Sequence, residues 1–254
     1  MTTFRARCAA ITLALPVAMT SMGCAPTTPS SRSGSTAPRL VLPAALEPQR
    51  AQYEADVAWA LGAVTGWFSE QGLQLPAGPL VKEVVVLGDT AEARRAVAAR
   101  AGVPESQVPD SFSGTVDGEA LLLVGREAYA ATFQRMYPQE LWSEGEYRRL
   151  AAHELAHRAH ELVAISATGS SEGMGPRWFF EGLALACAGQ FPTSSPGGLS
   201  PSEVRALIDQ DERKPLGYPR YADMFRSVAR TVPVKELVAR AGKPDFTATI
   251  GTSR

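Results

Sequence analysis

The three histidines of the chain, His153, His157 and His160, lie within eight residues of one another. Two of them enclose the run HELAH, in which Glu154 follows the first histidine. A helix turns about 100° per residue, so His153 and His157 stack on one face, one turn apart. From that face both imidazoles reach one Zn²⁺ at roughly 2.0–2.1 Å. Glu154 lies on the flank of that face, placed to hydrogen-bond a water on the metal. The alternative is an amphipathic surface helix whose histidines are merely polar.

A second stretch, Pro176 to Gln190, offers a third ligand. It reads PRWFFEGLALACAGQ, and after Arg177 its one charged residue is Glu181. A lone carboxylate in an apolar run is costly to bury unless it is paired or bound to a metal. Zinc enzymes with two histidine ligands need a third protein ligand and keep a fourth position for water. We therefore expect His153, His157 and Glu181 to hold one Zn²⁺. The alternative is a buried ion pair between Glu181 and Arg177.

The two motifs together resemble those of the gluzincin metallopeptidases, in particular the bacterial peptidase MA-like domains. In that family an H-E-x-x-H helix is followed by a W-x-x-E-G-x-A helix, and here Glu181 stands 24 residues after His157. The resemblance runs from about Gln52 to the C-terminus. It implies a zinc-dependent peptidase with Glu154 as the general base. One position departs from the pattern, because Leu185 stands where some gluzincins carry an acidic residue that orients a histidine.

The resemblance implies two further roles. A tyrosine near the start of a later helix would stabilise the oxyanion formed when water attacks the carbonyl, and we prefer Tyr221 to Tyr218 for this role. An edge strand around Phe112 to Thr115 would bind extended substrate by strand addition. The alternatives are that both tyrosines only pack, and that the strand belongs to a simple structural hairpin.

The first 23 residues have the features of a secretory signal. Arg5 and Arg7 form a basic start, and Cys8 to Met19 is an apolar stretch too short to span a membrane. The alternative to a lipoprotein signal is an ordinary signal cleaved near the same place.

The sequence Ser21-Met22-Gly23-Cys24 resembles a lipobox, with cleavage before Cys24 and lipidation of its thiol. Residues 24–45 then form a flexible tether, rich in Pro, Ser and Thr. We expect an exported protein, anchored by lipid to the extracytoplasmic side of a bacterial membrane. Of the three cysteines Cys187 alone would remain in the folded domain, where it forms no internal disulfide.

Composition limits the partners. Apolar residues make up 45% of the chain and charged residues 20%, which suits one packed domain, expected over residues 46–254. The formal net charge is −1, so we expect no nucleic-acid partner. The expected partners are a peptide or protein substrate and, through Cys24, the membrane.

The expected fold class is α+β, with a mainly helical zinc-binding half and a small antiparallel or mixed β-sheet. Gly62 and Gly66 in the first helix would let another element approach closely. The Gly- and Ser-rich segment 164–175 is either a lid over the site or a plain connector.

Periodicity and turn signals predict helices over 48–71, 90–100 (capped by Thr90), 128–137, from 143, from 176, from 202 and after 221, a strand over 81–87, and a hairpin over 113–124 turning at 117–118.

Two functions follow as hypotheses. The first is a zinc-dependent metallopeptidase in which Glu154 activates water. The second is a catalytically inactive zinc-binding lipoprotein of the cell surface with an interaction or structural role. Glu154 argues against the second, because it is no ligand and has little structural reason to be present. A third possibility is an unrelated lipoprotein with an accidental motif, which the joint presence of both motifs disfavours.

Overall fold

The computed structural model of the protein describes residues 37–192 and 198–250. The signal peptide expected over residues 1–23, the lipidation expected at Cys24 and most of the expected tether fall outside the described residues. Within the described part of the chain, no helix combines the length and the apolar character that a membrane span requires.

The chain alternates strands and helices at first and then continues as helices. The strands are β1 (Arg39–Val41), β2 (Glu83–Leu87), β3 (Gly114–Asp117) and β4 (Ala120–Val124). The α-helices are α1 (Arg50–Glu70), α2 (Thr90–Ala101), α3 (Arg126–Met136), α4 (Gly145–Thr168), α5 (Arg177–Ala188), α6 (Pro201–Arg213), α7 (Tyr218–Ala229), α8 (Val234–Arg240) and α9 (Phe246–Thr249), and short 3₁₀ turns cover Ala44–Gln49, Glu105–Gln107 and Ser171–Met174.

The four strands form one mixed sheet in the order β1-β2-β4-β3. β1 and β4 pair parallel to β2, whereas β3 pairs antiparallel to β4 and lies at the edge. The central strands β2 and β4 are continuous apolar runs because both of their faces are covered. The α+β class with a small mixed sheet is confirmed. The domain boundary at residue 45 falls too late, because Arg39–Val41 pairs with β2 through backbone hydrogen bonds that composition does not reveal.

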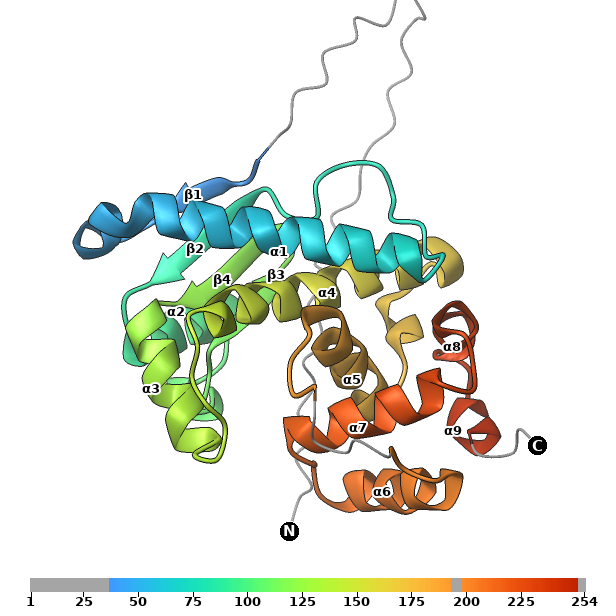
Figure 1. Ribbon diagram of the computed structural model, residues 1–254. Coiled ribbons are helices and arrows are strands. Elements are labelled where there is room, and N and C mark those ends of the chain that lie inside the picture. Colours follow the sequence, from blue (N-terminus) through green and yellow to red (C-terminus); the bar gives the residue numbers. More distant parts are fainter. Residues whose placement is uncertain (1–36, 193–197, 251–254) are drawn as a thin grey trace, which may run out of the picture.

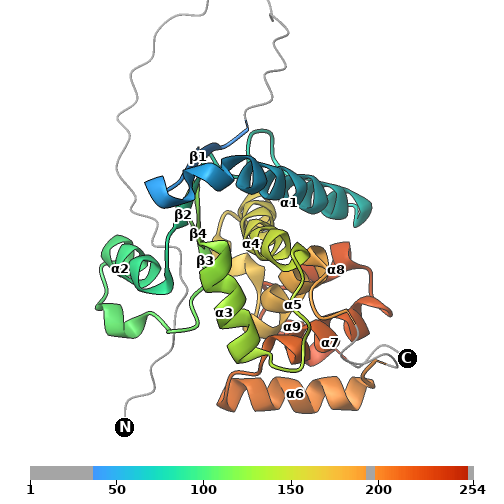
Figure 2. The same ribbon diagram turned by 60° about the vertical axis from the view of Figure 1, so that its left-hand side comes forward.

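Helices cover the two faces of the sheet unequally. Figure 2 shows α2 on one side of the sheet and α1, α3 and α4 on the other. Beyond α4, away from the sheet, lie α5 and α7, with α6 along the far side of the molecule (Figure 1). Helix α4 is therefore the middle layer between the sheet and the C-terminal helices.

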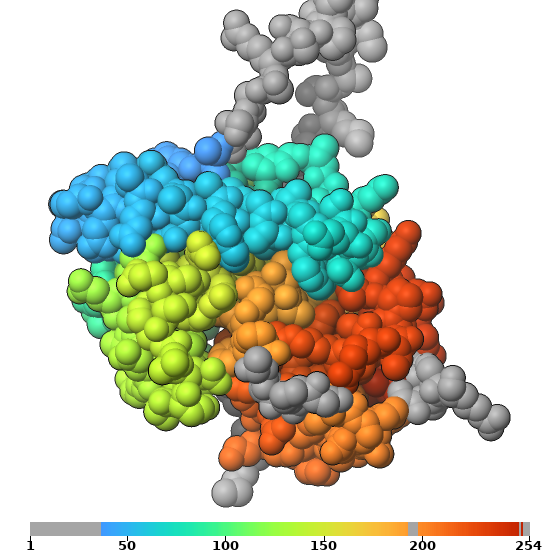
Figure 3. Space-filling view, viewed as in Figure 1, coloured from blue at the N-terminus to red at the C-terminus, as the bar shows by residue number. Residues whose placement is uncertain are grey.

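Helix α4 is enclosed on every side rather than amphipathic. Each of its residues from Gly145 to Ala164 is buried or half-buried. It packs against α1, α5, the edge strand β3 and the 3₁₀ turn Ser171–Met174, and its neighbours leave little of it visible in the space-filling view (Figure 3). The alternative expected from the sequence, an amphipathic surface helix, is therefore not observed.

Apart from Glu154, the charged residues of α4 have an opposite charge or an aromatic ring as partner. Arg158 donates to Glu161 at 2.6 Å, and Arg149 pairs with Glu146. The guanidinium of Arg148 lies 4.6 Å from the ring centre of Trp59 on α1, a cation–π contact. These pairs let a helix with several charges occupy the interior.

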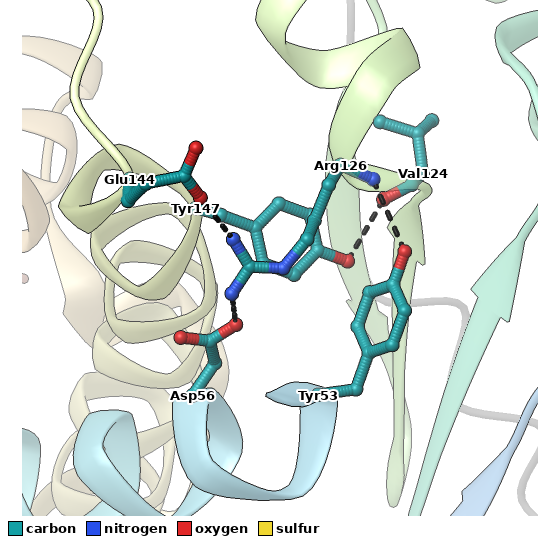
Figure 4. Close-up of polar contacts among 6 residues, drawn as sticks. All are labelled: Tyr53, Asp56, Val124, Arg126, Glu144 and Tyr147. Carbon is teal, nitrogen blue, oxygen red and sulfur yellow. Dashed lines mark hydrogen bonds and ion pairs between the residues drawn. The ribbon is translucent and has the colours of Figure 1, made fainter. Parts of the chain in front are cut away.

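A buried polar cluster fixes the start of α4 against α1 and α3 (Figure 4). Arg126 forms a buried ion pair with Asp56, and its guanidinium lies 4.9 Å from the ring centre of Tyr147. The Tyr147 hydroxyl donates to the carbonyl oxygen of Val124 at 2.9 Å. The hydroxyl of Tyr53 accepts a hydrogen bond from the backbone N–H of Arg126 at 3.2 Å. Contacts from three helices and β4 thus meet at one arginine, which sets where α4 begins relative to the sheet.

Helices α5 and α7 meet at a glycine. A Cβ on Gly182 would stand 2.5 Å from Cβ of Phe225 and 2.6 Å from the carbonyl oxygen of Tyr221. Only glycine permits this approach, because real Cβ atoms do not come within 3.0 Å of such neighbours. Gly182 follows Glu181, so the contact that fixes α5 lies next to the expected ligand.

Several local expectations were wrong in detail. Asp89, not Thr90, caps α2, because its carboxylate accepts the backbone N–H of Glu92 at 2.7 Å. The hairpin turns at Gly118 and Glu119, one residue later than predicted, since Asp117 still pairs with Ala120. Helix α4 continues to Thr168, so the first part of segment 164–175 is helical.

The expected role of two α1 glycines was also wrong. Gly62 and Gly66 face open space, and no other element approaches either of them closely. Nothing lies within 4 Å of a Cβ added at either glycine.

We predict that Gly182→Ala lowers the free energy of unfolding by about 1–3 kcal/mol, because the added methyl overpacks the contact between α5 and α7. Denaturant unfolding measures the effect. Gly66→Ala is the matched control, since its methyl meets nothing and its helix gains stability by up to about 1 kcal/mol. Equal stability of the Gly182→Ala variant and the wild type would contradict the packing described here.

Candidate metal centre

The three expected ligands come together. Nε2 of His153 and Nε2 of His157 lie 3.0 Å apart. Oε2 of Glu181 lies 3.4 Å from the first nitrogen and 3.5 Å from the second. Among the described residues this is a group of histidine and carboxylate side chains that could hold a metal ion. Helix α4 supplies the histidines from adjacent turns, and α5 supplies the carboxylate across the α4–α5 contact.

The size of this triangle fits a small tetrahedral ion. Two ligands at about 2.0–2.1 Å from such an ion stand about 3.4 Å apart, close to the three observed separations. Oε2 of Glu181 is buried and makes no conventional hydrogen bond. A buried carboxylate oxygen without such a partner is expensive unless a cation satisfies it. The residues present therefore fit a metal with two nitrogen ligands and one oxygen ligand, and the alternative pairing of Glu181 with Arg177 is not observed among the ion pairs of the described residues.

Electrostatics within the group favour a charged carboxylate. Burial alone would raise the pKa of Glu181, but the two histidines outweigh it and hold that pKa well below its usual range. Burial likewise opposes the charge on His157, whereas the Glu181 carboxylate raises the pKa of that imidazole overall. An anionic Glu181 at neutral pH is the form that ligates a metal.

Glu154 lies beside the group but outside the triangle. Its side chain is buried, and burial raises its pKa although the two histidines oppose the shift. A Cβ on Gly114, the first residue of β3, would stand 3.0 Å from Cγ of Glu154, so the glycine lets the edge strand come close. A carboxylate with a raised pKa is suited to accept and return a proton.

The two candidate tyrosines have different surroundings. The hydroxyl of Tyr221, preferred from the sequence, donates to Oδ1 of Asp211 at 2.6 Å and accepts the N–H of Leu216 at 3.1 Å. Its ring is fully buried, so these contacts hold the loop before α7. Tyr218 instead places its ring centre 5.4 Å from that of His153. The geometry therefore favours Tyr218 over the Tyr221 preferred from the sequence, because the first turn of α7 brings Tyr218 beside His153 and buries Tyr221 in the core.

His160 does not join the centre. Its side chain is fully buried, and its ring lies 5.6 Å from that of Phe179. Burial lowers the pKa of His160 to about 3, so this imidazole is neutral at physiological pH. Both of its ring nitrogens lack a hydrogen-bond partner in the described structure, as does Nδ1 of His153. Leu185 cannot hydrogen-bond His153, and no other described side chain does so at Nδ1. His153 therefore has no orienting side-chain partner among the described residues.

Sequence reasoning missed two residues next to the ligands. The ring centre of Phe180 lies 5.7 Å from that of His157. Burial raises the pKa of Tyr137 to about 12, and the charge of Glu181 adds to this shift, so the carboxylate acts electrostatically on this phenol. Phe180 is adjacent to Glu181 in sequence and could have been noticed, whereas Tyr137 precedes the HELAH run and no motif includes it.

Comparisons of the chain with protein-family models, with curated proteins and with solved structures find no match. The side chains of the candidate centre and their geometry therefore carry the evidence for function.

We predict that the purified protein binds about one metal ion per chain and that Glu181→Gln removes most of it, because the neutral amide is a poor ligand. Elemental analysis after dialysis measures the ratio. Glu172→Gln, at an exposed carboxylate in the turn Ser171–Met174, is the control and keeps the metal. A wild-type protein that holds no metal even after reconstitution would show that the triangle is not a metal site.

Proposed function

We propose that the protein is a zinc-dependent metallopeptidase that hydrolyses peptide bonds in peptide or protein substrates. The observation that carries this proposal is the triangle of His153, His157 and Glu181 with a buried, non-ligating Glu154 next to it. Two imidazoles and one carboxylate at tetrahedral spacing form a ligand set typical of catalytic zinc, which leaves a position for water. The HELAH and WFFEGLA motifs support the same reading.

The chain's own groups would divide the work of hydrolysis. Zn²⁺, when bound, supplies a Lewis acid that acidifies water and polarises the substrate carbonyl. Glu154 takes the proton of the attacking water as the new C–O bond forms. It then passes that proton to the leaving nitrogen as the C–N bond breaks, so that one water yields a carboxylic acid and an amine. Tyr218 beside His153 is the phenol best placed to donate to the oxyanion.

The edge of the sheet supports a role in substrate binding. β3 is paired on one side only, and Gly114 at its start lies against Glu154. An extended peptide could bind by adding a strand to this edge. Such a peptide would run past Glu154, the proposed general base. This agrees with the role expected for the segment Phe112 to Thr115, and a purely structural hairpin remains the alternative.

The second candidate function is that of a zinc-binding cell-surface lipoprotein without catalysis. It shares the metal site and the proposed anchor at Cys24. Burial of a second carboxylate beside Glu181 is costly and serves no ligation, so Glu154 favours the peptidase. The proposed location for either function is the extracytoplasmic side of a bacterial membrane, supported by the signal and lipobox features of residues 1–24.

We predict that Glu154→Gln lowers kcat/KM for peptide cleavage by about 10²–10⁴-fold while zinc content is unchanged, because the amide cannot accept the proton. Cleavage of an unbiased peptide library, followed by mass spectrometry, measures activity, and Glu172→Gln is the control. Undiminished cleavage by Glu154→Gln would refute this mechanism. A wild-type protein that binds zinc but cuts no peptide would favour the inactive lipoprotein.

Two substitutions distinguish the roles of Tyr218 and Tyr221. We predict that Tyr218→Phe lowers kcat about tenfold or more with stability unchanged, because the phenol near His153 is lost. Tyr221→Phe should instead lower stability by about 1 kcal/mol, since Asp211 and the N–H of Leu216 lose a partner. Kinetics and thermal unfolding of both variants check this, and the reverse pattern would return the catalytic role to Tyr221.

A further inference from the structure

Aromatic rings from three parts of the chain lie around the candidate centre, and two of them contact a histidine of the ligand triangle. Tyr218 at the start of α7 lies beside His153, and Phe180 in α5 lies beside His157. Tyr137, the residue that ends α3, packs against Phe133 and Phe191, and the charge of Glu181 acts on its phenol. None of the three is fully buried, and Tyr218 is 37% exposed.

These rings differ from the aromatic residues that fill the core. Phe179 and Tyr221, next to them in sequence or on the same helix, are fully buried. Tyr137, Phe180 and Tyr218 are instead half-buried or exposed. Phe180 and Tyr218 therefore offer ring surface to solvent beside His157 and His153.

Tyr137 is held in place by packing from a strained loop. Its ring centre lies 5.4 Å from that of Phe133 and 4.9 Å from that of Phe191. Phe191 has a φ of 48°, a conformation that residues other than glycine rarely adopt. Arg226 on α7 donates to the carbonyl oxygens of both Gln190 and Phe191 and so stabilises this backbone. The strain is sustained where it keeps an aromatic wall beside the centre.

The charge of the centre gives no reason to select a charged substrate residue. The carboxylates of Glu154 and Glu181 balance a divalent ion, and the neighbouring groups are aromatic rings. A charged side chain placed against those rings would lose hydration without gaining a partner. An aliphatic or aromatic side chain would bury apolar surface there instead.

We propose that Tyr137, Phe180 and Tyr218 form an aromatic rim that selects substrates with an apolar side chain next to the scissile bond. This inference rests on the proposed peptidase function. Phe180 and Tyr137 determine specificity, whereas Tyr218 also serves the reaction.

The cleavage-site profile of the full-length zinc protein on a mixed synthetic peptide library tests the rim. The wild type should cut at least tenfold more often next to apolar than next to charged residues. Tyr137→Ala and Phe180→Ala should each reduce that preference at least fivefold with zinc content unchanged. Leu141→Ala, which removes an exposed apolar side chain before α4, is the control and should leave the profile unaltered. Cleavage without regard to side chain, or a preference that survives both rim substitutions, would overturn the proposal.

A binding measurement keeps the test separate from activity. Calorimetric titration of zinc-loaded Glu154→Gln protein uses the blocked peptide Ala-Ala-Phe-Ala-Ala and its analogue with Asp in place of Phe. We expect at least tenfold tighter binding of the first peptide, lost when Tyr137→Ala is added. If the wild type cuts no peptide but this difference is found, the peptidase function fails and the rim stands. Equal affinities overturn the rim even if cleavage is observed.

Discussion

The burial of α4 on all sides is the constraint on which the rest of the structure depends. A helix that carries two metal ligands and six charged side chains besides cannot enter a core unless those charges are neutralised there. Arg158 and Glu161 neutralise one another, Arg148 lies over Trp59, and the ion pair of Arg126 with Asp56 fixes the helix start. With these contacts satisfied, α4 holds His153 in the interior and His157 half-buried beside it.

The third ligand is positioned by a different means. Glu181 reaches the histidines from α5, and α5 is held by its close contact with α7 at Gly182. The same contact brings the first turn of α7, and with it Tyr218, toward His153. One glycine therefore sets both a ligand and the adjacent phenol. Gly114 has a similar effect on β3, because the absence of a Cβ lets this edge strand lie against Glu154.

The candidate centre contains buried polar atoms that lack hydrogen-bond partners. Oε2 of Glu181 and Nδ1 of His153 are buried without hydrogen-bond partners, and Phe191 nearby has a strained backbone. Such costs are sustained when a surrounding scaffold over-determines the geometry, and they concentrate at functional sites. A bound cation would give Oε2 of Glu181 a partner and so remove the cost of burying it alone. Metal binding would therefore stabilise the fold. The aromatic rings around the ligands lower the local polarity and so strengthen this effect.

The sequence by itself determined the features that depend on neighbours along the chain. The spacing of HELAH places two histidines on one face of any α-helix, the apolar run around Glu181 demands a cation for its carboxylate, and alternating element signals specify an α+β fold. Packing between distant segments decided the rest. The pairing of Arg39–Val41 with β2, the position of Tyr218 beside His153 and the packing of Tyr137 against Phe191 all depend on contacts between segments far apart in the sequence. Helical periodicity is a local geometry, whereas the direction a side chain faces within a core is set by long-range contacts that no single stretch of sequence encodes.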